Sequence, residues 1–337
     1  MKTGLAVGAL PLQGGARMPL IGFHASHEQF PPSELLRLCQ KAERAGFQAA
    51  LNSDHFHPWT EAQGQSGFAW AFMGAALAST GLSFGSVTAP GQRYHPAIVA
   101  QALATLNEMY PGRAWMALGS GQYLNEAITG TGWPAKDLRN ARLKECVDIL
   151  RALFRGETVT HRGLVTVEEA KLYTRPKDMP LLIGAAVSPK TAEWVGSWAD
   201  GLITTARPPE ELRPVVESFR KGGGEGKPMF LKVQLSYASD DELAREGAYN
   251  QWASNIFANS VLTDLRAPAQ FQEAASVVQP HDLDGPLRVS SSLQQHVDWL
   301  GEDLRLGFDR LYLHNVNRDQ DGFIEAFGAK VLPALAR

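Results

Sequence analysis

Short apolar runs and helix-forming segments alternate along the whole chain, and this alternation limits the folds that it can adopt. Eight runs have the length and composition of buried parallel strands: residues 18–24, 47–53, 82–89, 113–118, 180–186, 200–205, 228–237 and 310–314. Helix-forming segments separate them, and the first opens with Pro32 and ends before Gly46, as helices commonly do. Strict alternation of this kind is typical of parallel sheets with right-handed crossovers. Eight such units predict an α/β fold, a closed (β/α)8 barrel of the TIM type.

The main alternative is an open, doubly wound sheet. Such a sheet usually carries a glycine-rich fingerprint directly after its first strand, whereas residues 24–27 contain no glycine. No repeat, linker or low-complexity segment divides the chain. We therefore expect one domain over residues 1–337, in which residues 1–17 form a flexible N-terminal extension. Residues 157–173 predict an inserted hairpin, and residues 258–286, which show no clear pattern, predict an irregular late insertion.

The composition limits the kinds of molecule that we expect the protein to bind. The 32 basic and 35 acidic residues are interspersed and give a net charge of −3, which argues against a nucleic-acid partner. No run of about 18 apolar residues is present, so we expect no membrane-spanning helix. Cys39 and Cys146 lie in leucine-rich helical segments without a CxxC or zinc spacing, which indicates reduced core thiols. We therefore expect a cytoplasmic protein that acts on a small molecule.

Polar side chains gather where the predicted strands end, which in a barrel is the face that carries the active site. Asp54, His55 and Trp59 follow the second strand. A histidine at this place can exchange a proton with a substrate, and an indole can stack on a bound ring. After the fourth strand, the small residues of segment 119–121 allow the backbone to approach a ligand closely. We therefore expect the binding site at these strand ends.

The histidines leave a second interpretation open, a metal-dependent hydrolase. His55 and His57 form an HxH pair, and alternate residues of an extended segment point the same way, so both imidazoles can share a metal ion. His24 and His314, at the ends of the first and last strands, are further candidate ligands. However, no acidic ligand directly follows the last strand, so we favour a site without a metal.

An ordered set of motifs makes the chain similar to a known family. The motifs are Ser53-Asp54-His55-Phe56-His57-Pro58-Trp59, Ser86-Val87, Arg93-Tyr94-His95-Pro96-Ala97, Tyr110-Pro111-Gly112-Arg113, and Gly119-Ser120-Gly121 with Asn125-Glu126. Together they resemble the luciferase-like flavin oxidoreductase superfamily, close to the deazaflavin-dependent glucose-6-phosphate dehydrogenases, over residues 21–337. The resemblance implies a homodimer whose barrel holds a flavin-type ring at its C-terminal mouth.

The resemblance also implies roles for individual residues. Asp54 would hydrogen-bond the ring, His55 would act as the catalytic acid or base, and Trp59 would line the substrate side. Ser86 and Val87 would form a non-prolyl cis peptide under the ring, a bond that costs about 3–4 kcal/mol. The remaining implied cofactor contacts are Gly121 and Asn125, along the cofactor tail.

Two departures from the family pattern affect the choice of cofactor. The deazaflavin dehydrogenases carry a glutamate where this chain has Gln122, which cannot exchange a proton. They also carry two glycines where this chain has Ala185 and Ala186, which make close approach of the cofactor harder. We therefore expect a relative that uses FMN, a flavin-dependent monooxygenase or dehydrogenase. The alternatives are a dehydrogenase of a sugar phosphate or similar alcohol that uses 8-hydroxy-5-deazaflavin (coenzyme F420), and a non-catalytic flavin-binding protein.

Overall fold

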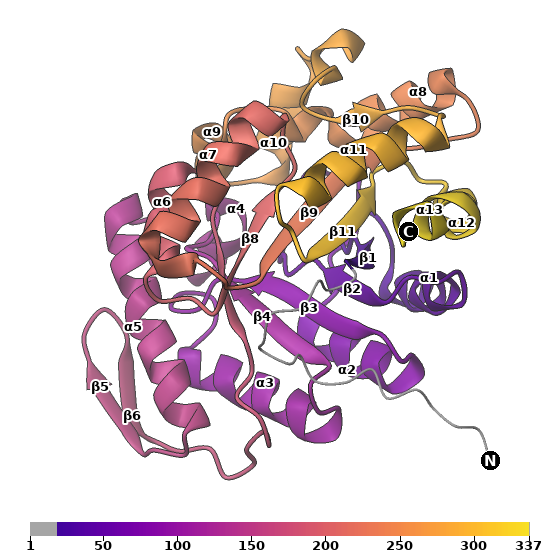
Figure 1. Cartoon of the computed structure of the whole chain (residues 1–337). Helices are drawn as coiled ribbons and strands as arrows, with labels where there is room; N and C mark the ends of the chain where they lie inside the picture. Colours follow the sequence, from indigo (N-terminus) through magenta and orange to yellow (C-terminus); the bar gives the residue numbers. More distant parts are fainter. Residues whose placement is uncertain (1–18, 337) are drawn as a thin grey trace, which may run out of the picture.

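The computed structural model describes residues 19–336 and contains a closed barrel of eight parallel strands (Figure 1). The barrel strands are β1 (Leu20–Ala25), β2 (Ala49–Asn52), β3 (Ser83–Thr88), β4 (Ala114–Leu118), β7 (Leu182–Ala185), β8 (Gly201–Thr205), β9 (Met229–Ser236) and β11 (Arg310–Asn315). They pair in the order β9-β11-β1-β2-β3-β4-β7-β8, and the pairing of β8 with β9 closes the ring. The predicted TIM-type barrel is confirmed. The predicted extension over residues 1–17 lies outside the described residues.

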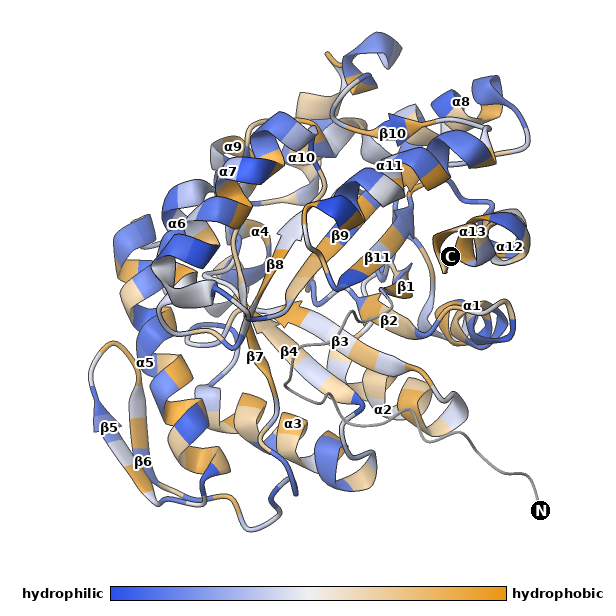
Figure 2. Cartoon of the chain, viewed as in Figure 1, coloured by the Kyte–Doolittle hydropathy of each residue, from blue (hydrophilic) through white to orange (hydrophobic). Residues whose placement is uncertain are grey.

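Helices follow the strands and surround the barrel (Figure 1). They are α1 (Pro32–Arg44), α2 (Ala69–Ser79), α3 (Pro96–Met109), α5 (Lys136–Phe154), α6 (Pro189–Gly196), α7 (Pro209–Phe219), α8 (Asp241–Trp252), α11 (Leu293–Arg305) and α12 (Gln320–Ala326), with short α4 (Tyr123–Glu126) and α13 (Leu332–Leu335). Proline at the first turn or a polar N-cap, such as Asp240 at α8, begins most of them. Hydrophobic and hydrophilic residues alternate along α5 and α11 (Figure 2), so each buries one face. No described helix is both long and apolar enough to cross a membrane.

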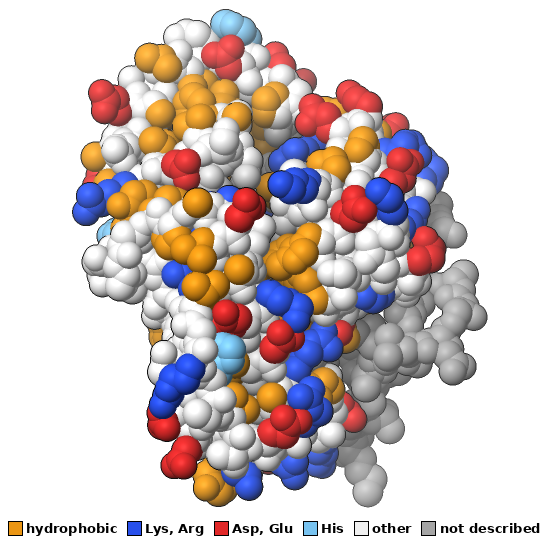
Figure 3. Space-filling model, turned by 90° about the vertical axis from the view of Figure 1, so that its left-hand side faces the viewer, with side chains coloured by type: hydrophobic (Ala, Val, Ile, Leu, Met, Phe, Trp, Pro, Cys, Tyr) orange, Lys and Arg blue, Asp and Glu red, His pale blue; other side chains and the backbone are white. Residues whose placement is uncertain are grey.

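Two insertions depart from the simple barrel. The predicted hairpin is present as antiparallel β5 (Val159–Arg162) and β6 (Thr166–Ala170). The late insertion is more regular than expected, because it contains α9 (Asn259–Asp264) and α10 (Pro268–Ala275), and β10 (Arg288–Val289), which follows it, pairs with β9. These elements are too short to show a periodic pattern in the sequence. On the face drawn in Figure 3, basic and acidic side chains lie among one another.

Large side chains fill the inside of the barrel and form the floor under its mouth. Trp115, Phe230 and Tyr312 contact one another there, with ring centroids 4.9–6.2 Å apart. Glycines on neighbouring strands leave space for them: a Cβ on Gly85 would overlap the indole of Trp115, and one on Gly22 would overlap the ring of Tyr312. The inside of the barrel is therefore filled by side chains up to this layer, and space for a ligand is left only above it.

We expect Gly85→Ala to destabilise the fold by about 1–3 kcal/mol, because the added methyl overpacks the indole layer. Gly74→Ala is the matched control, since Gly74 lies inside α2 and the nearest atom to its added Cβ is 4.0 Å away. That control should gain about 0.5–1 kcal/mol from helix propensity. Urea denaturation of both variants measures the two changes, and equal stability of the two variants would contradict this account of the floor.

Candidate active site

A cavity of about 1080 Å³ opens at the C-terminal ends of the barrel strands, as predicted for a barrel enzyme. Nearly all the predicted site residues line it. They are Asp54, His55, Trp59, Val87, Gly121, Gln122, Asn125, Ala185 and Ala186. The exception is Ser86, which is buried beside β2, where its hydroxyl donates to the Asn52 carbonyl oxygen at 3.1 Å. The sequence therefore places the mouth of the cavity correctly.

A buried carboxylate orients His55. Nδ1 of His55 lies 2.9 Å from Oε1 of Glu28, while Oε2 of Glu28 accepts hydrogen bonds from Ser26 (2.8 Å) and Ser53 (2.7 Å). Burial alone would raise the pKa of Glu28, but the contacts with His55, Lys232 and Ser53 hold that pKa well below its usual range. The His55 side chain is 16% exposed, so Nε2 is the ring nitrogen left for a ligand in the cavity.

Sequence reasoning missed Glu28. It lies in the turn that follows β1, beyond the end of the strand, so a survey of strand ends passed over it. The signal that could have identified it is its place after the first strand, at the same edge of the sheet as His55 after the second. A carboxylate and a histidine at neighbouring strand ends are the two parts of a common general-base pair.

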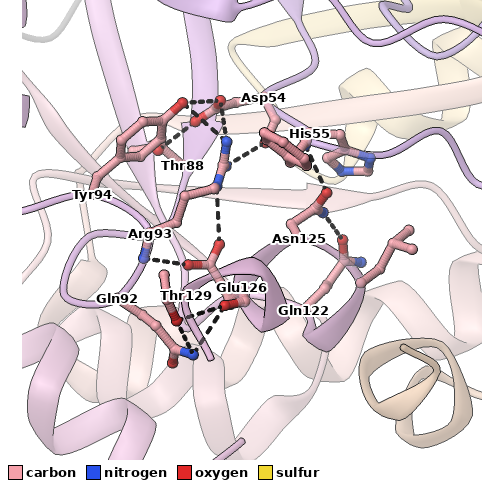
Figure 4. A network of polar contacts seen from close by, with 12 residues as sticks. Asp54, His55, Thr88, Gln92, Arg93, Tyr94, Gln122, Asn125, Glu126 and Thr129 are labelled. Atoms are coloured by element: carbon pink, nitrogen blue, oxygen red, sulfur yellow. Dashed lines mark hydrogen bonds and ion pairs between the residues drawn. The ribbon is translucent and has the colours of Figure 1, made fainter. Parts of the chain in front are cut away.

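Asp54 belongs to a second buried network, which Figure 4 shows. Its Oδ2 accepts a hydrogen bond from Thr88 (2.5 Å), and its Oδ1 accepts one from the Tyr94 hydroxyl (2.8 Å) and one from the Arg93 guanidinium (3.3 Å). Arg93 also contacts Glu126, whose carboxylate accepts from the Arg93 backbone N–H at 2.9 Å. Burial raises the pKa of Glu126, and Arg93 opposes that rise. These contacts fix the position of Asp54 at the wall of the cavity.

Asn125 fixes the segment that carries His55. Its side-chain oxygen accepts hydrogen bonds from the backbone N–H groups of Phe56 (2.9 Å) and His57 (3.4 Å), and its amide donates to Oε1 of Gln122 at 3.4 Å. The ring of His57 is directed to the carbonyl oxygen of Leu124, with Nδ1 at 2.9 Å. The alternative of an HxH metal pair therefore gains no support, because of these two histidines only His55 lines the cavity.

The other candidate metal ligands do not converge either. His24 and His314 lie below the cavity mouth with ring centroids 4.4 Å apart, and His314 contacts Gln29 through Nε2 at 2.9 Å. Over residues 19–336, no group of three or more His, Cys, Asp or Glu side chains is placed to share a metal ion. The side-chain geometry thus gives the hydrolase alternative no support.

The cis peptide bond expected between Ser86 and Val87 is absent from the described structure. No cis peptide bond occurs among the described residues, so the Ser86–Val87 bond is trans. The regular pairing of β3 with β4 continues through Val87 and Thr88, which requires ordinary extended backbone. The Val87 side chain is nevertheless 37% exposed at the cavity. Gly121 has a φ of 82°, and a Cβ there would lie 2.9 Å from Glu126, so glycine is required at this turn.

Buried neutral histidines make the stability of the protein depend on pH. Burial lowers the pKa of His27 and of His296 to about 4, and it lowers the pKa values of His24 and His314 well below 6.5. Between pH 6.5 and pH 4 the unfolded chain therefore binds more protons than the folded chain, so stability falls as the pH falls. At pH 5 we expect a loss of roughly 2 kcal/mol from each of His27 and His296.

Urea denaturation at pH 7.5 and pH 5.0 measures this loss. In His296→Gln, the difference between the two pH values should be smaller than in the wild type, because one of the titrating groups is absent. Equal stability at the two pH values would show that these histidines are not held neutral by the fold.

Comparison with known proteins agrees with the geometry. The family model described as luciferase-like monooxygenase matches residues 18–310. The chain belongs to this family. A relative from Microbacterium testaceum, an F420-dependent glucose-6-phosphate dehydrogenase, is 34% identical over 328 residues, which cover 94% of this chain and 97% of the relative. A second enzyme of that name, from Mycolicibacterium smegmatis, is 33% identical over 331 residues, with 94% and 98% covered.

A solved structure of a family member is also similar along its whole length. It is an F420-dependent secondary alcohol dehydrogenase in complex with an F420–acetone adduct, with 31% identity and a TM-score of 0.88 over 94% of this chain and 99% of that one. The predicted resemblance to luciferase-like oxidoreductases is therefore confirmed, and the chain is an oxidoreductase of this family.

Proposed function

We propose that the protein is a dehydrogenase that oxidises an alcohol with coenzyme F420 as the hydride acceptor. The observation that carries this proposal is His55, whose ring is oriented by Glu28 and open to the cavity. The relatives that are at least 30% identical support it, because their names specify F420 and substrates with hydroxyl groups. They favour the deazaflavin alternative over the FMN-using monooxygenase or dehydrogenase that the departures at Gln122 and Ala185 suggested.

The residues of the cavity fit a deazaflavin. Val87 projects from one wall, and the backbone turn at Gly121 and the small Ala185 leave space for a flat ring. Thr204 lies at the cavity, and its buried hydroxyl has no hydrogen-bond partner in the described part of the chain.

The rim of the same cavity fits the anionic tail of this cofactor. Lys190 lies at the first turn of α6, and Arg207 follows β8. Both are cavity residues with positive charge. These residues would hold the tail. When bound, the deazaflavin would supply the acceptor for the hydride that leaves the carbinol carbon.

The side chains of the chain account for the proton. Nε2 of His55 would accept the hydroxyl proton, and the carboxylate of Glu28 would offset the positive charge that the imidazole then carries. Gln122 can donate a hydrogen bond but cannot exchange a proton, and Glu126 is engaged by Arg93. The base on the substrate side is therefore His55, and Trp59 packs against its ring with centroids 4.8 Å apart.

Reduction of coenzyme F420 tests the proposal directly. We expect the visible absorbance of the oxidised deazaflavin to fall when the purified protein is mixed with a secondary alcohol such as 2-butanol or a hydroxy acid. Glucose 6-phosphate should be included because relatives are named for it. The same alcohols with FMN under air are the control. Oxygen consumption with FMN, with no bleaching of the deazaflavin, would overturn the proposal.

A further inference from the structure

The inward-facing positions of β9 place a lysine at the bottom of the cavity. Side chains alternate along a strand, so Phe230, Lys232 and Gln234 share the inner face. Phe230 belongs to the packed floor with Trp115, whereas Lys232 and Gln234 line the cavity above it. Lys232 is therefore the first charged side chain above the floor on this strand.

The ammonium group of Lys232 lacks a partner. Within the described residues it forms no ion pair and no hydrogen bond, and the ring of Trp252 lies 5.6 Å from Nζ. Burial lowers the pKa of Lys232, although Glu28 opposes this change. The carboxylate of Glu28 is already bound by His55, Ser26 and Ser53. A half-buried cation without a hydrogen-bonded partner is costly to the fold, which indicates that a ligand provides one.

Apart from the carboxylate of Glu28, the described groups packed around Lys232 are neutral. His24 and His314 feel its charge and are neutral, because burial and Lys232 lower their pKa values well below 6.5. Trp252, which packs edge to face on His314 with centroids 5.0 Å apart, covers one side. Further apolar lining of the cavity comes from Trp59, Ile256, Phe257 and Leu262. The result is a positive charge at the bottom of the cavity, in addition to Lys190 and Arg207 at its rim.

A second unsatisfied group lies on the same strand face. The amide of Gln234 donates to the carbonyl oxygen of Ala206 at 3.0 Å, which fixes the side chain, but within the described residues its Oε1 has no hydrogen-bond partner. This oxygen is itself buried, so Lys232 is the polar group of this strand face that the proposal uses for a ligand.

We propose that Lys232 binds the carboxylate of the substrate, so that the preferred substrate is a short hydroxy acid rather than a neutral alcohol or a sugar phosphate. This inference rests on the proposed function, because His55 must accept the proton of the same molecule. One ammonium matches a monoanion, whereas a phosphate dianion calls for several cations. Glu28 contacts His55 and interacts with the charge of Lys232, which places the anion close to the carbinol.

A matched pair of substrates isolates the carboxylate. In 2-hydroxybutyrate a carboxylate replaces one methyl group of 2-butanol, and both carry the same secondary hydroxyl. With coenzyme F420 as acceptor, we expect kcat/KM to be about 10- to 100-fold higher for the acid. In Lys232→Met this ratio should fall towards one, and in Lys232→Arg, which keeps the charge, it should remain largely intact. Lys221→Met, at a lysine whose side chain is 74% exposed, is the control for a lost lysine.

Binding of the products provides a readout that needs no turnover. We expect 2-oxobutyrate to quench tryptophan fluorescence of the wild-type protein, through Trp252 and Trp59, at far lower concentration than butanone does. Lys232→Met should bind the two equally. If the methionine variant does not fold, Lys232→Gln, which also removes the charge, serves the same purpose.

The outcomes separate this inference from the proposed function. Oxidation of 2-butanol with an acid preference below about two-fold, or a preference that Lys232→Met leaves unchanged, overturns the inference and leaves the dehydrogenase standing. Preference for glucose 6-phosphate overturns it in the same way. Binding of 2-oxobutyrate that depends on Lys232, without reduction of the deazaflavin by any alcohol, supports the carboxylate site and counts against the dehydrogenase.

Discussion

His55→Ala is expected to lower turnover by about 10²–10⁴-fold, which is the usual contribution of a general acid or base. The reason is geometric: His55 contacts Glu28 through Nδ1 and lines the cavity with the rest of its ring. The variant should fold normally, because a side chain at the cavity contributes little to the packed barrel floor. Steady-state reduction of coenzyme F420 and thermal unfolding of the same preparation measure the two effects separately.

His57→Ala is the matched control for this experiment. His57 is two residues away, but its ring contacts the backbone of Leu124 instead of lining the cavity. Its loss should leave kcat within a few-fold of the wild type. Glu28→Gln keeps the shape of the positioning residue and removes its charge, so kcat should fall in that variant while KM changes little. A wild-type rate in His55→Ala would remove this histidine from the mechanism.

Arg93→Leu is expected to destabilise the protein by about 3–5 kcal/mol, which is the loss typical of removing one partner of a buried ion pair. The Arg93 side chain is 8% exposed, and those of Asp54 and Glu126 are 2% exposed. Leucine would leave both carboxylates buried without their cation. Urea denaturation at pH 7.5 measures the change in the free energy of unfolding.

Arg37→Leu is the control, because Arg37 forms its ion pairs with Glu34 and Asp321 at the surface, where its side chain is 46% exposed. Exposed pairs of this kind contribute about 1 kcal/mol or less. A loss in Arg93→Leu no larger than the loss in Arg37→Leu would mean that Asp54 and Glu126 are stabilised by something other than Arg93.

The sequence predicts the barrel well because each strand and helix is a local pattern. The apolar runs, the prolines at helix starts and the capping residues act within a few positions. The site at the ends of β2 and β4 follows from the barrel, because all strand ends meet at one mouth. For this reason the amino-acid sequence alone is sufficient to select Asp54, His55 and Trp59 as candidate site residues, and all three line the cavity.

The remaining site residues depend on contacts between distant parts of the chain. Glu28 contacts His55 from the turn after β1, and Arg93 reaches Asp54 from the loop after β3. No local pattern marks such pairs. Lys232 occupies an inward position within β9, and a charged residue at such a position is a signal that the sequence contains. The sequence prediction used only residues at the ends of strands and therefore did not include it. The helices of the late insertion are six and eight residues long, which is too short for a periodic pattern to reveal them.

The choice of cofactor weighs two single substitutions against similarity along the whole chain. Gln122 and Ala185 differ from the deazaflavin pattern and favoured FMN, whereas the similarity extends over 94% of the chain to enzymes named for F420. In the structure Gln122 contacts Asn125, and Ala185 lines the cavity with a small side chain that leaves it open.

A fluorescence titration of the purified protein with coenzyme F420 and, separately, with FMN tests the central claim most directly. The account predicts saturable, tight binding of the deazaflavin and binding of FMN that is weaker by at least about ten-fold, a difference of roughly 1.4 kcal/mol. Tight binding of FMN with weak binding of the deazaflavin would contradict the account and restore the flavin monooxygenase as the better interpretation.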